Sequence, residues 1–140
     1  MDSIELEQLR NEALERGLLN AERLADFTLP DLSQICNGIG PDFFADELRK
    51  FIDDLHPTLR PAAMVHDLDF YLGKGTWEDF TAANDRLAVN GIICANERYK
   101  FYDPRRYLVQ RSARRFAALC QMFGWKAYLA AIEQRKGGGK

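Results

Sequence analysis

The chain has 140 residues, of which 46% are hydrophobic and 29% are charged, a balance typical of one globular domain and not of a disordered segment. No apolar run approaches the ~20 residues that a membrane-spanning helix needs, and the acidic, amphipathic N-terminus (residues 1–17) is not a secretory signal. We therefore expect a protein that stays in the cytoplasm or leaves the cell by a non-classical route.

Helical periodicity is the main signal in the first third of the chain. Ser3 caps a predicted helix that ends near Gly17. Two brief helical turns are expected at 20–25 and 31–35, separated by an extended segment before Pro30.

Residues 36–41, Cys-Asn-Gly-Ile-Gly-Pro, are predicted to form a loop. Its two glycines permit positive φ angles and a close approach of the backbone to a ligand. The third glycine and the preceding strand of a dinucleotide-binding fingerprint are absent, which argues against a dinucleotide site. Pro41 suits the first position of a helix that continues to Leu55.

Two central helices, at about 61–72 and 77–92, are expected to pack antiparallel because a tight Gly-Lys-Gly turn joins them. A short β-hairpin is predicted near 92–101, where aromatic and charged residues alternate. A long basic helix then runs from Asp103-Pro104 to about residue 135. The sequence thus predicts a mainly α, single-domain fold over residues 1–136, followed by a flexible tail at 137–140.

Three cysteines, Cys36, Cys94 and Cys120, are widely spaced and odd in number. This pattern gives no zinc motif and is weak for a disulfide framework. We expect free, buried thiols, and a Cys36–Cys94 bridge is the alternative in an oxidising compartment.

The helix at 61–72 carries three polar residues, His66, Asp67 and Asp69, although its apolar residues cover nearly all sides. A charge buried without a partner costs several kcal/mol. A cation, a partner side chain or a water-filled cleft is therefore expected beside these residues.

Asp85, on the next helix, is positioned to approach His66 if the two helices pack antiparallel. A carboxylate on one imidazole nitrogen fixes the tautomer and leaves the other nitrogen to take a proton from water. Asp67 would then be free to hold a hard cation with oxygen ligands from a nearby loop. The alternative is a histidine that is only a satisfied part of the core.

Three segments together resemble a known family: residues 36–41, the run Ala-Ala-Met-Val-His-Asp-Leu-Asp-Phe-Tyr at 62–71, and Ala-Asn-Asp-Arg-Leu at 83–87. They are similar to the small calcium-dependent phospholipases A2 of prokaryotic, fungal and viral type. The resemblance covers residues 36–94. The family's tyrosine stands four residues after the histidine, where this chain has Phe70, and Tyr71 follows it.

The resemblance implies that His66 deprotonates a water molecule and that Asp85 orients His66, with Tyr71 supporting this second aspartate. It also implies that Asp67 binds Ca²⁺ together with the backbone carbonyls of Cys36, Gly38 and Gly40. The bound cation would polarise the ester carbonyl. The products would be a lysophospholipid and a free fatty acid.

Charge is unevenly distributed along the chain. Residues 1–97 hold 8 Lys/Arg and 19 Asp/Glu, whereas residues 98–140 hold 11 Lys/Arg and 2 acids. The basic end either packs on the acidic body or contacts an anionic partner, and a phospholipid membrane surface or anionic lipid is the expected one. No helix-turn-helix or aromatic-stacking motif supports nucleic-acid binding.

Two functions follow from these patterns. The first is calcium-dependent hydrolysis of the sn-2 ester of glycerophospholipids. The alternative is a non-catalytic helical binding protein of a phage or bacterium, which uses the basic C-terminal helix to bind a protein or nucleic acid.

Overall fold

The computed structural model describes residues 2–37 and 45–138 and is mainly α-helical, as the sequence predicts. In chain order the elements are α1 (Ser3–Glu15), the 3₁₀ helix η1 (Ala21–Asp26), α2 (Leu29–Asn37), α3 (Asp46–Asp53), the 3₁₀ turn η3 (Pro57–Leu59), α4 (Arg60–Tyr71), α5 (Trp77–Arg98), α6 (Pro104–Phe123) and α7 (Trp125–Gly138).

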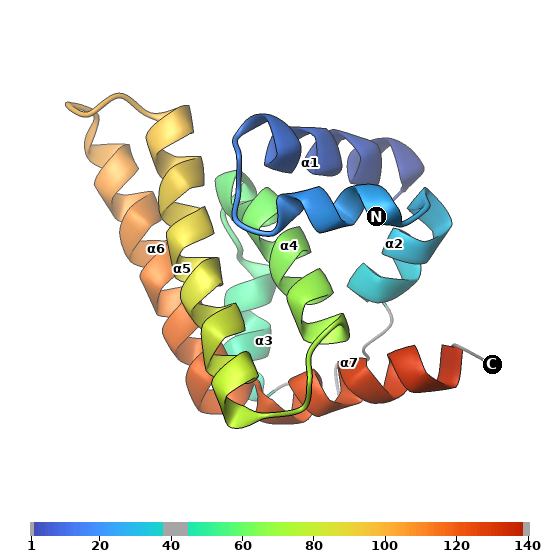
Figure 1. Cartoon of the computed structure of the whole chain (residues 1–140). Coiled ribbons are helices and arrows are strands. Elements are labelled where there is room, and N and C mark those ends of the chain that lie inside the picture. The colour runs from blue at the N-terminus through green and yellow to red at the C-terminus, as the bar shows by residue number, and fades with distance from the viewer. Residues whose placement is uncertain (1, 38–44, 139–140) are drawn as a thin grey trace.

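Helix α4 occupies the centre of the fold. It packs against α1 and α2 on one side, α5 on another, and α7 near its C-terminal end (Figure 1). Its apolar side chains are therefore buried in several directions, and Met64, Val65 and Leu68 are each at most 2% exposed. Burial on nearly all sides is what the distribution of apolar residues around this helix predicts.

Helices α5 and α6 form a long antiparallel hairpin beside α4 (Figure 1). They approach closely at Gly91, where an added Cβ would lie 2.4 Å from the Cβ of Ala113. The β-hairpin predicted near 92–101 is wrong, because α5 continues through this segment to Arg98. Cys94 and Ala95 are buried on α5, so packing against the neighbouring helices outweighs the alternation of aromatic and charged residues beyond them.

The basic segment near the C-terminus is divided into α6 and α7 at Gly124, and α7 turns back beneath α4 (Figure 1). Tyr128 of α7 is fully buried and anchors the α4–α5 turn: its hydroxyl accepts from the Gly75 N–H at 2.9 Å and donates to Asp79 at 3.0 Å. A Cβ at Gly73 would lie 2.3 Å from the Tyr128 ring, so this turn requires glycine there.

The polar side chain of Asp69 is compensated by three partners from two other elements. Its carboxylate accepts from Arg86 of α5 at 2.9 Å, from the Asn20 amide at 3.0 Å, and from Arg23 of η1 at 3.5 Å. The Asp69 side chain is only 1% exposed. This network ties α4 to α5 and to the α1–η1 region.

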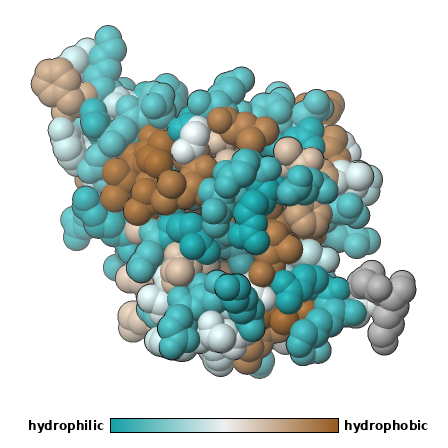
Figure 2. Space-filling model, in the orientation of Figure 1, coloured by the Kyte–Doolittle hydropathy of each residue, from teal (hydrophilic) through white to brown (hydrophobic). Residues whose placement is uncertain are grey.

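No helix in the described part of the chain is both long and apolar enough to cross a bilayer. Figure 2 shows hydrophilic side chains over most of one face, with a hydrophobic patch over α5. At the α5–α6 end, Phe101 and Tyr102 are exposed, whereas Phe116 of α6 and Tyr128 of α7 point inward.

Replacing Asp69 tests whether its network holds the fold together. Asp69→Asn leaves two arginines without their carboxylate, so we expect the free energy of unfolding to fall by about 3 kcal/mol. Asp85 is exposed and lies next to Arg86 in the sequence. Asp85→Asn is therefore the matched control and should leave the stability unchanged. Urea unfolding of both variants measures the difference, and equal stabilities would show that the network contributes nothing.

Candidate functional site

His66 is buried on α4 and is held by α5 through a side-chain amide. Its Nε2 lies 2.8 Å from Oδ1 of Asn84, and the His66 residue is 5% exposed. The sequence prediction that Asp85 would hold this imidazole is therefore wrong. One residue along a helix is a rotation of about 100°, which carries Asp85 to the exposed face of α5 while Asn84 faces the core.

The Asn84 amide is itself held in a chain of hydrogen bonds. Its Nδ2 donates to Oε1 of Gln121 on α6 at 2.7 Å, and Nε2 of Gln121 donates to the Thr81 hydroxyl at 2.9 Å. Because Nδ2 is directed to Gln121, the oxygen of the Asn84 amide faces His66, and a carbonyl oxygen can only accept. This orientation of the amide favours the tautomer in which Nε2 of His66 carries the proton and Nδ1 keeps its lone pair.

The surroundings of the imidazole favour its neutral form. The His66 ring lies 4.2 Å from the Phe70 ring centre and 6.2 Å from that of Phe116. Burial lowers the pKa of His66, and this effect outweighs the hydrogen bond to Asn84 and the charge of Asp69, which raise it. A neutral imidazole with a free Nδ1 is a general base in its reactive protonation state.

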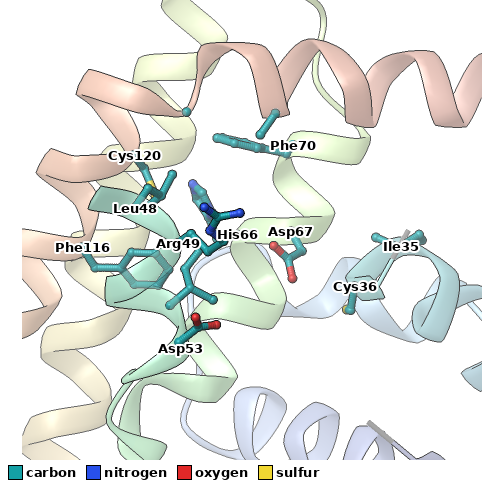
Figure 3. A pocket seen from close by; sticks show the side chains of 13 residues that line it. Ile35, Cys36, Leu48, Arg49, Asp53, His66, Asp67, Phe70, Phe116 and Cys120 are labelled. Carbon is teal, nitrogen blue, oxygen red and sulfur yellow. The ribbon is translucent and has the colours of Figure 1, made fainter. Parts of the chain in front are cut away.

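His66 and Asp67 line a cavity of about 290 Å³ between α2, α3, α4, α6 and the start of α7 (Figure 3). Most of its wall is apolar and comes from Ile35, Leu48, Ile52, Phe70, Phe116 and Ala127. Arg49 and Asp53 of α3 also line it, and Arg49 pairs with Asp46 on the same helix. The cavity thus combines one imidazole, two carboxyl groups and one guanidinium with an apolar wall.

Asp67, unlike Asp69, is not compensated within the described part of the chain. It makes no hydrogen bond or ion pair to any residue described there, and it faces the cavity (Figure 3). Burial raises the pKa of the Asp67 carboxyl from 3.8 to about 8. A positive charge nearby would lower the cost of ionising this carboxyl, and Arg49, which lines the same cavity, pairs with Asp46 instead.

A cation beside Asp67 would depend on oxygen atoms other than side-chain carboxylates. The described residues contain no group of three or more His, Cys, Asp or Glu able to hold a metal. The C-terminal end of α2 approaches Asp67 at Cys36 (Figure 3), and the last carbonyls of a helix are free acceptors with partial negative charge. Gly38 and Gly40, whose carbonyls the resemblance assigns to Ca²⁺, lie outside the described residues, so the calcium site stays a prediction.

Of the remaining predicted site residues, one lines the cavity, one lies away from His66 and two fall outside the described residues. Cys36 lines the cavity, whereas Gly38 and Gly40 lie outside the described residues. Tyr71 packs edge-to-face on Phe27 at 6.4 Å, so it does not support the partner of His66 as the resemblance implies. Phe70, one residue earlier, takes the place beside the imidazole.

The cysteines are free thiols, as expected, with Cys94 and Cys120 buried and Cys36 partly buried. Burial, together with the nearby charge of Asp67, raises the pKa of both the Cys36 and the Cys120 thiols. Both groups are therefore protonated near neutral pH, and neither is an activated nucleophile.

Sequence reasoning missed Asn84 and Gln121. A signal for Asn84 was present, because it lies four residues after Phe80 and three before Leu87, both of which face the core. Gln121 gave no such signal, since its contact with Asn84 joins residues 37 positions apart.

Asp67 should make stability depend on pH in calcium-free buffer. The pKa of Asp67 is about 8 in the folded protein, and we take its usual value of 3.8 for the unfolded chain. Between these two pH values the folded protein retains a proton that the unfolded chain has released. The stability from this group is present below about pH 4 and is lost as the pH rises through 8. Asp67→Asn cannot titrate, and we expect it to melt about 5 °C above the wild type at pH 8.5 but equally at pH 4.5.

Thermal melts followed by circular dichroism in a chelator measure this difference. His66 is common to both proteins, so its own titration cancels in the comparison. Asp53→Asn, at an exposed position on the same cavity, is the control and should follow the wild type. A constant difference between Asp67→Asn and the wild type at all pH values would contradict a raised pKa.

Comparison of the chain with protein-family models, curated proteins and solved structures gave no match.

Proposed function

We propose that the protein is a calcium-dependent esterase that hydrolyses the sn-2 ester of glycerophospholipids. The observation that carries this proposal is the pairing of His66 and Asp67 in one largely apolar cavity, with Nε2 of His66 bound to Asn84. That bond leaves Nδ1 as the basic nitrogen of the imidazole. The resemblance of residues 36–94 to small phospholipases A2 supports the same reaction.

In the proposed reaction, Nδ1 of His66 takes a proton from a water molecule as its oxygen attacks the ester carbonyl carbon. The tetrahedral intermediate then collapses, the bond between this carbon and the glycerol oxygen breaks, and His66 returns the proton to that oxygen. A free fatty acid and a lysophospholipid leave. No covalent intermediate with the protein is needed, which agrees with the protonated state of the cavity thiols.

Asp67 and the backbone carbonyls near Cys36 would hold the Ca²⁺. When bound, this ion would polarise the ester carbonyl and stabilise the negative charge that develops on its oxygen. A bound cation would also compensate the Asp67 carboxylate, which makes no ion pair with a described residue. Asp67 would therefore lower the stability of the calcium-free protein and bind the cation that assists hydrolysis.

The apolar wall of the cavity suits a hydrocarbon chain, which supports a lipid as the substrate. The proposed partner is accordingly a phospholipid surface, with anionic lipid favoured by the basic character of residues 98–140. Arg111, Arg114 and Arg115 of α6 are exposed and available for such a contact.

A second candidate is a non-catalytic protein that binds a macromolecule through the basic face of α6. Two observations favour it. Asn84 has no charge with which to stabilise a protonated imidazole, and the exposed arginines of α6 suit an acidic protein or a nucleic acid equally well. The two candidates differ in whether His66 is required for turnover of a lipid.

Hydrolysis can be measured as fatty-acid release from phosphatidylglycerol and phosphatidylcholine vesicles in calcium. The wild type should release fatty acid, and His66→Gln, which can still bond to Asn84, should lose at least about 100-fold in rate. His56→Gln, at the other histidine of the chain and in an exposed position, is the matched control and should retain full activity. Background release by both the wild type and His66→Gln would reject the esterase and favour the second candidate.

Calcium binding can be tested separately from turnover, because a ligand stabilises only the state that it binds. At pH 8, calcium at about 100 times its Kd should add about 2.7 kcal/mol to the stability of the wild type. This gain should shrink towards pH 6, since the cation must displace the proton from Asp67.

Melting curves with calcium, magnesium or a chelator measure the effect. Asp67→Asn should show no calcium-specific rise in Tm, whereas Asp53→Asn should behave as the wild type. A calcium-specific rise that survives in Asp67→Asn would place the cation elsewhere.

A further inference from the structure

We infer that Gln121 of α6 is a positioning residue that sets the tautomer of His66 through the side-chain amide of Asn84. The inference rests on the proposed function only for its catalytic consequence. The geometry itself is a chain of three hydrogen bonds that joins Thr81, Gln121, Asn84 and His66.

The direction of the first two bonds decides the third. A primary amide has one face that donates and one that accepts, so an amide held at one face has its other face determined. Oε1 of Gln121 accepts from Nδ2 of Asn84 at 2.7 Å, which leaves Oδ1 of Asn84 towards the imidazole at 2.8 Å. The proton of His66 is thereby fixed on Nε2.

Thr81 is the partner of Gln121 at the other end of this chain. Its hydroxyl oxygen accepts from Nε2 of Gln121 at 2.9 Å. Thr81 is one turn before Asn84 on α5, so α5 holds both partners of Gln121 and α6 contributes the link between them.

An amide at position 84 makes this link necessary. A carboxylate has two accepting oxygens and would accept from Nε2 in either orientation. An asparagine rotated by 180° would instead present its NH₂ group to Nε2, and the proton would move to Nδ1. His66 would then have no free lone pair on Nδ1, the nitrogen assigned as the base. Gln121 removes this ambiguity.

Three substitutions at position 121 separate the orientation of the Asn84 amide from the packing of the side chain at position 121. Because Gln121 is partly exposed, the fold should accept these changes. Gln121→Glu keeps an acceptor for Asn84 and should keep the proton on Nε2. Gln121→Lys donates to Oδ1 of Asn84 and should reverse the amide, moving the proton to Nδ1. Gln121→Met has neither group and should give a mixture of tautomers. Gln110→Leu changes another glutamine of α6, bonded to Asn96, and is the matched control.

The readout is the nitrogen spectrum of ¹⁵N-histidine-labelled protein at one fixed pH, in which a protonated and an unprotonated ring nitrogen differ in chemical shift. The chain has only two histidines, and His56→Gln assigns the signals of His66. We expect the Nε2–H form in the wild type, Gln121→Glu and Gln110→Leu, and the Nδ1–H form in Gln121→Lys. The wild-type tautomer in both Gln121→Lys and Gln121→Met would overturn the inference.

Fatty-acid release by the same variants distinguishes this inference from the proposed function. Gln121→Lys should lose at least about tenfold in rate while Gln121→Glu retains activity. A tautomer change in a protein without any lipid hydrolysis would support the positioning role and reject the esterase. Hydrolysis with an unchanged tautomer would support the esterase and reject the positioning role.

Discussion

The burial of α4 is the constraint on which the rest of the structure depends. A helix surrounded by other helices has little solvated surface for polar side chains, yet this one carries a histidine and two aspartates within four residues. Each must find its compensation inside the protein. Asp69 obtains it from two arginines and an amide, and His66 obtains it from Asn84. Asp67 alone faces the cavity without a described partner.

The two compensated residues also align the framework. Asn84 and Arg86 are two residues apart on α5, and they bind His66 and Asp69, which are three apart on α4. These two attachments fix how α5 is rotated against α4. The rotation that carries Arg86 to Asp69 also carries Asn84 to the imidazole and leaves Asp85 in solvent. The orientation of α5 against α4 therefore also determines which residue contacts His66.

Much of this arrangement could be predicted from sequence, where the signals are local. The Thr76 hydroxyl accepts from the Asp79 N–H and caps the second central helix, a contact between residues only three apart. The buried character of 61–72 and the antiparallel pairing of the two central helices also follow from periodicity and a short turn. The prediction of Asp85 as the partner of His66 was wrong because it relied on the charge of the residue and not on the side of the helix that the residue faces. The buried residues Phe80 and Leu87 mark the side of α5 that faces the core. Gln121 depends on the crossing of α5 and α6, which no local pattern encodes.

The neutral partner of His66 has an electrostatic consequence. In a hydrolytic cycle the imidazole becomes positive when it accepts a proton, and burial disfavours that form. A carboxylate at position 84 would stabilise the cation but would add a second buried negative charge to a site that already holds Asp67. With an amide there, the tautomer is fixed without that cost, and the protonated imidazole is only weakly stabilised. Such a base returns its proton readily to the leaving oxygen, so weak stabilisation of the cation assists the second half of the proposed reaction while it slows the first.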